Sequence, residues 1–328
     1  MAKRISFSVG DFKNLQLHIY TIGYPQEGET IITIIYDKAK RAVLFTSLTD
    51  CYKDKALNYN HIQSVLKEYG NPSINVFIWT HPDEDHSLGI PEILNCYDSK
   101  HEAVIYIPAS LDRQDAFPIC KESMKAFTFL MKNYDCNQKY LVKQVTLTDQ
   151  ESRSLYVIEL IEERTRRTIH CSFNFLAPFG SLLLRRSAGD KPFVMNDLSI
   201  VYAMKINGYN FLYCGDLANQ SVQFLNEDFF QNVSFVKIPH HGSDEPKGFM
   251  RKLLRNGVKG VVATTTIYGG GKLPVEGVIN GYKGISREIY GTGSGKEKFG
   301  CVGNFFNISD FICYTELSGN ALCYYEQS

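Results

Sequence analysis

Hydrophobic and polar positions along the chain predict strands that alternate with helices. β-Branched and aromatic residues fill 15–22 (LQLHIYTI) and 30–36 (TIITIIY), and the turn-forming stretch GYPQEGE separates them, so we expect a pair of strands. In NYNHIQSVLKEYG, apolar residues recur at helical spacing from Ile62 to Tyr69, and Gly70 ends the pattern, which predicts an amphipathic helix. The apolar run 74–79 (INVFIW) predicts a strand that is buried on both faces.

The same alternation continues to about residue 265. The pair Asn207-Gly208 readily adopts φ > 0 and predicts a tight hairpin between two apolar strands. Further expected elements are a strand at 103–108 (AVIYIP), a helix at 118–134 (PICKESMKAFTFLMKNY), a meander of strands over 139–180, a helix at 218–230 (ANQSVQFLNEDFF) and a glycine-rich tail after 265. This order is typical of layered α/β proteins, and since no low-complexity linker interrupts it, we expect a single domain over residues 1–328.

Composition and charge narrow the possible partners. The chain is 44% hydrophobic, which is enough for a large core, and it carries 35 basic and 35 acidic residues, so only a local patch could attract nucleic acid or an anionic membrane. The start has no apolar signal-peptide segment, and no uncharged apolar run of about 18 residues follows, so we expect no membrane span and a cytoplasmic protein. Nine cysteines without CxxC pairs favour reduced, mostly buried thiols.

Side chains that can bind metals follow three of the predicted strands. HPDEDH occupies 81–86 after INVFIW, Asp216 follows FLYCG, and His240 and His241 follow VSFVKIP. A single histidine or aspartate at such a place is more often a turn former or a helix cap. The ends of parallel strands converge at one edge of an α/β fold, however, and the three groups together predict a metal site.

The three motifs resemble those of the metallo-β-lactamase superfamily. HPDEDH resembles its H-x-H-x-D-H signature, with Asp83 in place of the second histidine, and FLYCGDL resembles the strand that ends in its bridging aspartate. VKIPHHGSDEP is similar to the PHHGS motif of the branch that includes the corresponding domain of competence DNA-uptake channel proteins. The resemblance spans about residues 17 to 300 and implies a four-layered αββα sandwich, in which two mixed β-sheets are flanked by helices.

The resemblance also implies a role for each matching residue. The metal ligands that it implies are His81, Asp83, Asp85, His86, Asp216 and His241. His81 and Asp83 would hold one cation, and Asp216 would bridge to a second. Between the paired histidines we favour His241 as the ligand. Asp85, His240 and Lys237 are our catalytic candidates. His240 would either support the ligands or contact the phosphate, and His240 or Lys237 could stabilise the charge that develops in the reaction.

Two departures from the family pattern affect the first cation. The family supplies a further histidine before the GD strand, but only His101 and His170 lie in that interval, and the surroundings of both favour structural roles. Asn196 or Asp197 could take the place of that ligand. The family's aspartate at the end of the third strand is also displaced, and Asp50 is a candidate for it, although it could equally be an ordinary loop residue.

The ligand set predicts one or two divalent cations. Three imidazoles and three carboxylates are richer in oxygen than the usual histidine-rich set, so Mn²⁺ competes with Zn²⁺ as the expected metal. Two such ions about 3.5–4 Å apart can share a water and lower its pKa toward neutrality, which supplies a hydroxide nucleophile.

These inferences favour a metal-dependent hydrolase, and within that class a phosphodiesterase or nuclease. The basic stretches RTRR (164–167) and KLLRNGVK (252–259) could steer a nucleic acid if they flank the metal site, and otherwise they are solvated surface. The first alternative is a hydrolase of small esters, lactones or phosphoesters. The second is a metal-binding module without catalysis that serves a multi-component assembly. The sequence does not indicate the oligomeric state.

Overall fold

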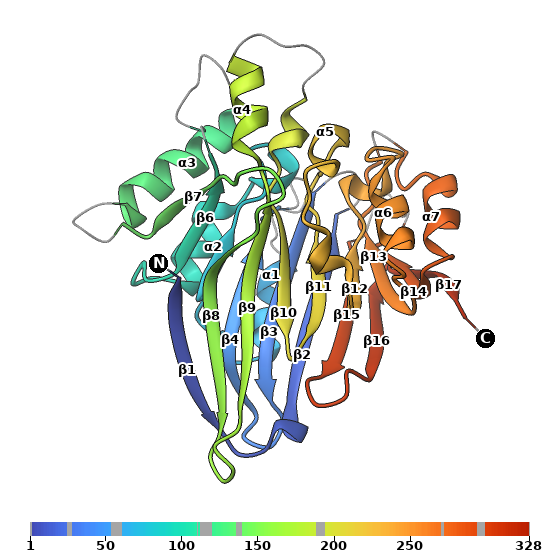
Figure 1. The fold of residues 1–328 in the computed structure, drawn as a ribbon. Helices are drawn as coiled ribbons and strands as arrows, with labels where there is room; N and C mark the ends of the chain where they lie inside the picture. The colour runs from blue at the N-terminus through green and yellow to red at the C-terminus, as the bar shows by residue number, and fades with distance from the viewer. Residues whose placement is uncertain are drawn as a thin grey trace.

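The computed structural model describes residues 2–24, 28–53, 61–109, 111, 120–135, 140–187, 194–269, 272–293 and 299–327. Within these ranges the chain forms two mixed β-sheets that pack face to face, with helices on the outer face of each sheet (Figure 1). This arrangement confirms the predicted fold class. None of the helices in the described ranges is long and apolar enough to cross a membrane.

Sheet A contains nine strands within the described part of the chain. In spatial order they are β1 (Lys3–Val9), β8 (Arg153–Glu162), β9 (Thr168–Ala177), β10 (Val201–Ile206), β11 (Tyr209–Tyr213), β12 (Val233–Lys237), β13 (Val261–Thr265), β14 (Ser286–Gly291) and β17 (Leu322–Glu326). The pairs β1–β8, β11–β12, β12–β13 and β13–β14 are parallel, and the other neighbours are antiparallel.

Sheet B contains eight described strands and is also mixed. In spatial order they are β16 (Cys313–Gly319), β15 (Gly300–Asn307), β2 (Leu15–Gly23), β3 (Glu29–Asp37), β4 (Ala42–Thr49), β5 (Val76–Ile78), β6 (Val104–Pro108) and β7 (Val142–Val145). Pairing is antiparallel from β16 to β4 and parallel from β4 to β7.

The helices divide between the two outer faces. The α-helices are α1 (His61–Glu68), α2 (Ile90–Tyr97), α3 (Lys121–Tyr134), α4 (Gly180–Ser187), α5 (Asn219–Val222), α6 (Phe249–Arg255) and α7 (Glu276–Tyr282). Short 3-10 helices are η1 (Phe12–Asn14), η2 (Glu84–His86), η3 (Met195–Leu198), η4 (Glu227–Phe230) and η5 (His240–Gly242). Apolar residues of α1, α2 and α3 pack on sheet B, and those of α6 and α7 belong to the core that includes sheet A.

Alternation along β3 explains how one strand serves two layers. Ile31 and Ile35 point into the core between the sheets, whereas Ile32 and Ile34 point into the core under the helices of sheet B. All four side chains are buried. Because side chains alternate between the faces of a strand, a strand covered on both faces must be apolar at nearly every position, as TIITIIY is.

Hydroxyl pairs link the two sheets across the inner core. Thr33 on β3 bonds to Tyr213 on β11 at 3.0 Å, and Thr49 on β4 bonds to Tyr202 on β10 at 2.7 Å. These polar atoms are buried, so each needs its partner. The pairs therefore fix how sheet A lies on sheet B, and with it the relative position of the loops that leave each sheet.

We expect Tyr213→Phe to lower the free energy of unfolding by about 1–2 kcal/mol, because it removes one buried hydrogen bond and leaves the Thr33 hydroxyl without that partner. Urea denaturation measures the change. Tyr209→Phe is the matched control, since Tyr209 lies on the same strand with its side chain 39% exposed. A loss for Tyr213→Phe no larger than for this control would contradict a structural role for the pair.

The structure corrects several sequence-based expectations. The predicted meander over 139–180 is wrong in part, because β7 joins sheet B beside β6 while β8 and β9 pair in sheet A. The expected helix at 218–230 is a single turn, α5, followed by η4. The expected tail contributes β14 to β17, and β1 was not predicted at all. The predicted Asn207-Gly208 turn is confirmed between β10 and β11, with both residues at positive φ.

The described cysteines form no disulfide, and half of them are buried: Cys51, Cys171, Cys214 and Cys301. Cys96 and Cys323 are exposed, so the expectation of mostly buried thiols holds only in part.

Candidate metal centre

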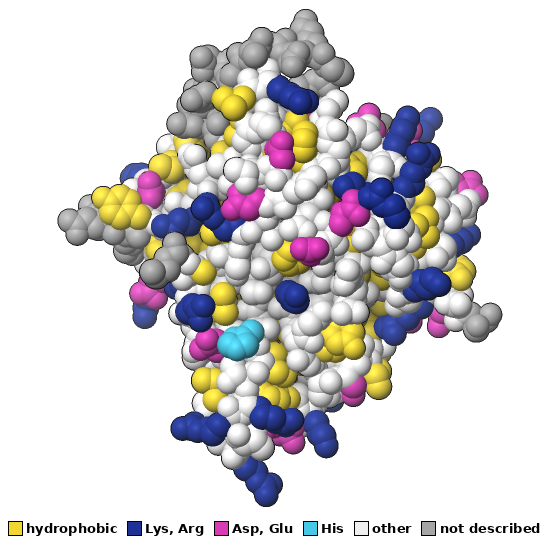
Figure 2. Space-filling model, viewed as in Figure 1, with side chains coloured by type: hydrophobic (Ala, Val, Ile, Leu, Met, Phe, Trp, Pro, Cys, Tyr) yellow, Lys and Arg dark blue, Asp and Glu magenta, His cyan; other side chains and the backbone are white. Residues whose placement is uncertain are grey.

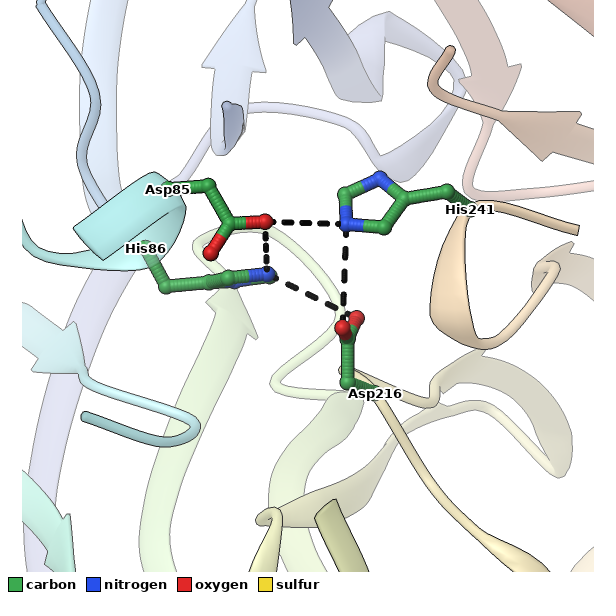
Figure 3. A group of neighbouring side chains, drawn as sticks. All are labelled: Asp85, His86, Asp216 and His241. Carbon is green, nitrogen blue, oxygen red and sulfur yellow. Dashed lines mark ion pairs between the residues drawn. The ribbon is translucent and has the colours of Figure 1, made fainter. Parts of the chain in front are cut away.

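The predicted metal-binding side chains meet at one end of the sandwich, where loops from both sheets converge. His81 and the 3-10 helix η2 follow β5 of sheet B, whereas Asp216 and the 3-10 helix η5 follow β11 and β12 of sheet A. Figure 3 shows Asp85 and His86 reaching in from one side, and Asp216 and His241 from the other. Strand ends from two sheets thus supply the four side chains.

Two glycines allow these loops to approach so closely. Gly215 has φ +47°, and a Cβ there would lie 2.5 Å from the hydroxyl of Ser199, which accepts the Asp216 N–H at 3.0 Å. Gly242 has φ +78°, and a Cβ there would lie 2.5 Å from Pro274 Cβ. Because a side chain at either place would clash and adopt an unfavourable φ, the glycines of the GD and HHG motifs are steric requirements of the site.

Asp85, His86, Asp216 and His241 form a compact buried group (Figure 3). The Nε2 atom of His241 lies 3.2 Å from Asp85 Oδ2 and 3.6 Å from Asp216 Oδ2. The Nε2 atom of His86 lies 3.5 Å from both Asp85 Oδ2 and Asp216 Oδ1. Ligand atoms about 2.1 Å from a common cation are about 3–3.5 Å apart, so this spacing suits one metal ion.

A second group adjoins the first and shares Asp216 with it. The Nε2 atom of His81 lies 3.6 Å from Asp83 Oδ2 and 3.7 Å from Asp216 Oδ2. Asp83 is the most accessible of these residues, with half of its side chain exposed. The Asp216 carboxylate therefore lies between the two groups, in the place of a bridging ligand.

Hydrogen bonds to buried Asp50 set the tautomers of two histidines. The Asp50 carboxylate accepts from the Nδ1–H of His86 at 2.8 Å and from the backbone N–H and hydroxyl of Thr80, each at 2.6 Å. Since the Thr80 hydroxyl gives its proton to Asp50, it accepts one from His81 Nδ1, 3.1 Å away. Both rings therefore donate through Nδ1 and turn Nε2 toward the cluster, where that nitrogen can take up a cation or a second proton.

The atoms that face the cluster fit metal cations. Buried atoms without a hydrogen-bond partner in the described part of the chain include His81 Nε2, His86 Nε2, His241 Nε2 and Asp216 Oδ1. Buried polar atoms are normally satisfied, and lone pairs of neutral imidazoles beside carboxylates can all be satisfied by cations. The donor set of imidazole nitrogens and carboxylate oxygens therefore matches one or two divalent ions.

The charges in the cluster are strongly coupled. Burial opposes the charged form of His86, but the carboxylates of Asp85, Asp216 and then Asp50 outweigh it and hold the His86 pKa well above its usual value. Burial likewise opposes ionisation of Asp216, yet its pKa is lowered because the imidazoles of His241, His86 and His81 surround it. The site thus favours positive charge at His86 and His241 and negative charge at Asp216, so protons compete with cations for the same atoms.

His240 lies at the rim of the cluster. Its Nε2 is 3.7 Å from Asp216 Oδ2 and 3.3 Å from the side-chain nitrogen of Asn196, and 27% of its side chain is exposed. His240 and His241 both have φ near +50°, which is unusual for residues with a side chain and turns the two rings in different directions. His240 is therefore accessible where His241 is buried.

Lys237 is buried away from solvent. Its Nζ lies 2.6 Å from Glu29 Oε2 and donates to the carbonyl oxygen of Ile238 at 3.0 Å. Its side chain has no exposed surface, which differs from the surface lysine that a strand end would ordinarily carry.

The other candidates lie around or away from the cluster. His101 stacks on Tyr134, and His170 is exposed on β9, so neither belongs to the group. Asp197 accepts hydrogen bonds from the backbone N–H groups at the start of α5, so its carboxylate is directed there. Asn196 and Asp197 were the two candidates to replace the further histidine of the family pattern, and Asn196 is the one that contacts His240.

Sequence reasoning missed three residues that contact the histidines. Glu29, Thr80 and Thr266 form hydrogen bonds or ion pairs with the metal-binding side chains or their partners. Of the three, only Glu29 had a signal in the sequence: it is an acidic residue at the start of the apolar run TIITII, and a buried carboxylate requires a partner. Threonines in strands are too common to be informative.

The two basic stretches do not surround the cluster. RTRR lies in the turn between β8 and β9, at the end of sheet A opposite Asp216 and about 30 Å from it along β9, and Arg167 there pairs with Glu162. In the second stretch, Lys252 and Arg255 both pair with Glu227. On the face of the molecule drawn in Figure 2, which is viewed as in Figure 1, acidic side chains lie among the basic ones.

Comparisons with known proteins give limited information. No family model matches the sequence, and no curated protein matches it significantly. The chain is similar to the metallo-β-lactamase fold protein YhfI from Bacillus subtilis, with 12% identity, a TM-score of 0.30, and coverage of 76% of this chain and 71% of that one. It is also similar to the Rm3 metallo-β-lactamase, with 11% identity, a TM-score of 0.31 and coverage of 75% and 74%. Both TM-scores are low, so the fold class is assigned from the sheets and helices of this chain itself.

Proposed function

We propose that the protein is a metal-dependent hydrolase that cleaves phosphodiester bonds, with nucleic acid as the preferred substrate class. The observation that carries the proposal is the Asp216 carboxylate, which lies 3.5–3.7 Å from the buried Nε2 atoms of His81, His86 and His241, between two groups of metal-binding side chains. Such an arrangement fits two neighbouring cations. The similarity of the HHGS loop to that of DNA-uptake proteins supports the choice of nucleic acid.

Each side chain has a role in this proposal. Bound divalent cations, Zn²⁺ or Mn²⁺, would polarise the phosphoryl oxygen and lower the pKa of a water molecule. Asp85, His86 and His241 would hold one cation and His81 and Asp83 the other, and Asp216 is close enough to both groups to contribute to each. Their placement on strand ends of two packed sheets keeps the ligands at fixed distances, so little reorganisation accompanies the reaction.

His240 is positioned to contact the substrate. It is the exposed histidine of the pair, it lies beside Asp216, and its ring is not held by a buried carboxylate as His86 is. A ring N–H of His240 donates a hydrogen bond to a phosphoryl oxygen. Burial lowers the pKa of His240 and outweighs the opposing effect of the Asp216 carboxylate, so the neutral ring is favoured. Lys237 lies too deeply buried for that contact, so we assign it a supporting role toward Glu29.

The positions of the basic residues favour a second candidate, a hydrolase of small esters, lactones or phosphoesters. A polynucleotide is usually held by basic side chains that neutralise phosphates along a groove. Here RTRR lies at the far end of sheet A, and Lys252 and Arg255 are neutralised by Glu227. A small substrate needs no such groove.

A substrate panel separates the candidates. Protein loaded with Mn²⁺ or Zn²⁺ is incubated with single- and double-stranded DNA, RNA, a lactone and a thioester, and the metal content of each sample is measured. We expect cleavage of at least one nucleic acid. Turnover of the lactone or thioester alone would favour the second candidate, and less than one tightly held cation per chain would favour a non-catalytic module.

The double variant Asp85→Ala/His86→Ala should lose this cleavage, because it removes two ligands of one cation. His170→Ala is the matched control, since His170 is an exposed histidine outside the cluster and its variant should retain full activity. Failure of fully metal-loaded protein to cut any nucleic acid would refute the nuclease proposal.

A further inference from the structure

A second buried carboxylate, Glu29, lies behind the cluster and close to Asp50, since ligand atoms of Glu29, Asp50 and His86 all lie within 4.8 Å of one another. Glu29 begins β3 of sheet B, and only 1% of it is exposed. Asp50 follows β4, the neighbouring antiparallel strand, so the two carboxylates lie at the same end of sheet B. Asp50 bonds directly to His86. Among the described residues, Glu29 forms no direct hydrogen bond to a metal-binding histidine, although it lies 3.7 Å from His241 Nδ1, and its contacts indicate a connection through another side chain.

Three side chains surround the Oε2 atom of Glu29. Lys237 Nζ lies 2.6 Å away and the Thr266 hydroxyl donates to the same oxygen at 2.6 Å. The Thr266 hydroxyl is also 2.7 Å from His241 Nδ1, whereas His241 Nδ1 is 3.7 Å from Glu29 Oε2, beyond hydrogen-bond distance. Thr266, which follows β13 and is fully buried, therefore stands between the carboxylate and the ring.

The direction of the protons follows from this chain of contacts. A carboxylate beside a buried ammonium is ionised and can only accept, and a hydroxyl has a single proton to donate. Because Thr266 gives its proton to Glu29, it must accept from His241, so the His241 proton lies on Nδ1. The His241 Nε2 then faces Asp85 and Asp216 and is the nitrogen that a cation can bind.

We propose that Glu29, acting through Thr266, is a positioning residue that holds His241 in its metal-binding tautomer and orientation, and that Lys237 holds the Glu29 carboxylate in place through the buried ion pair. The inference rests on the proposed metal centre but not on the proposed substrate. Partners of this kind, which hydrogen-bond the second nitrogen of a ligand histidine, fix the ring and strengthen its bond to the metal.

The contacts that run from Lys237 through Glu29 and Thr266 to His241, which we call the relay, also connect the two sheets. Glu29 belongs to sheet B, whereas Lys237, His241 and Thr266 lie on or directly after strands of sheet A. Asp50 and His86, by contrast, both belong to the sheet B side of the site. A ligand from sheet A is thus aligned by a carboxylate from sheet B, so the packing of one sheet on the other sets the metal geometry.

The test measures metal affinity. Metal-free protein is titrated with Mn²⁺ or Zn²⁺ in competition with a chelating indicator, which gives the affinities of the two binding steps. We expect Thr266→Val, which keeps the shape but removes the hydroxyl, to weaken one step by about 10–100-fold. Thr266→Ser restores the hydroxyl and should rescue the affinity to within about threefold of wild type.

Two further variants separate positioning from stability. Thr264→Val changes a buried threonine on β13 whose hydroxyl contacts Thr21 instead, so it should leave both affinities unchanged. Glu29→Gln/Lys237→Met removes both charges of the pair together and should weaken the same step as Thr266→Val, because a carboxamide no longer accepts strongly from the relay.

Several outcomes would overturn the inference. The first is that Thr266→Val binds metal as tightly as the control Thr264→Val. The second is that Thr266→Ser binds metal as weakly as Thr266→Val. The third is that Glu29→Gln/Lys237→Met binds metal with wild-type affinity. Wild-type protein that binds no cation would refute the metal centre as well. Normal affinities without cleavage of any nucleic acid would remove only the proposed substrate.

Discussion

Replacing Asp216 by asparagine should reduce hydrolysis by at least about 10³-fold and weaken the binding of both cations. Asparagine keeps the size of the side chain but loses the charge, and Asp216 is the carboxylate that contacts three of the metal-binding histidines. Loss of metal-derived stabilisation of several kcal/mol in the transition state corresponds to a rate loss of this order. Turnover by metal-loaded protein and the number of cations per chain measure the two effects.

Two comparisons make this prediction specific to the bridging position. Asp83→Asn should have a smaller effect, because the Asp83 carboxylate forms an ion pair with one metal-binding histidine, His81, where Asp216 contacts three, and half of the Asp83 side chain is exposed. Asp197→Asn is the matched control, since Asp197 is a buried aspartate near the site whose carboxylate caps α5. An Asp216→Asn protein that retains two cations and normal turnover would be incompatible with a bridging role.

Local sequence motifs carried most of the information about the site. HPDEDH places His81, Asp83, Asp85 and His86 on one short loop, and their order after an apolar strand predicted where that loop emerges. The ends of parallel strands converge, so the contributions of Asp216 and His241 could be expected from strand order alone. These predictions succeed because each depends on a few neighbouring residues and on one general rule of topology.

The supporting residues could not be predicted in the same way. Glu29, Thr80 and Thr266 come from three separate strands, and their roles depend on a hydroxyl or carboxylate lying within hydrogen-bond distance of one ring nitrogen. No periodicity or spacing encodes such a contact. The direction of the Lys237 side chain could not be predicted either, since a lysine at the end of a strand can point to solvent or inward. It points inward here because it pairs with the buried carboxylate of Glu29.

The periphery of the fold was hard to predict for a different reason. β1 reads KRISFSV, with mostly exposed or half-buried positions, and β16 is similarly exposed. Edge strands bury one face at most, so their hydrophobic signal is weak and their polar residues resemble loops. β7 is short and polar as well, and its place in sheet B depends on its pairing with β6, which sequence neighbours do not reveal.

Lys237→Met should lower the free energy of unfolding of metal-free protein by about 3–5 kcal/mol, one of the largest single effects expected in this chain. The pair of Lys237 and Glu29 is buried, and removal of one partner leaves an uncompensated charge. Burial alone would raise the pKa of Glu29, but Lys237 first, then His241 and His86, lower it in the wild-type protein. Without Lys237, burial should raise the Glu29 pKa, so the destabilisation should grow as the pH rises above the ordinary pKa of glutamate.

The double variant Glu29→Gln/Lys237→Met decides whether the effect comes from the unpaired charge. With both charges removed, neither member of this pair is left as an unpaired buried ion, so the double variant should be more stable than Lys237→Met, and its stability difference from wild type should be nearly independent of pH in this range. Lys205→Met, at an exposed lysine on β10, is the control and should change stability by less than about 1 kcal/mol. Denaturation in the presence of a chelator at several pH values gives these differences. If Lys237→Met and the double variant were equally destabilised at every pH, packing rather than charge would explain the loss, and Lys237 would not be what keeps Glu29 ionised for His241.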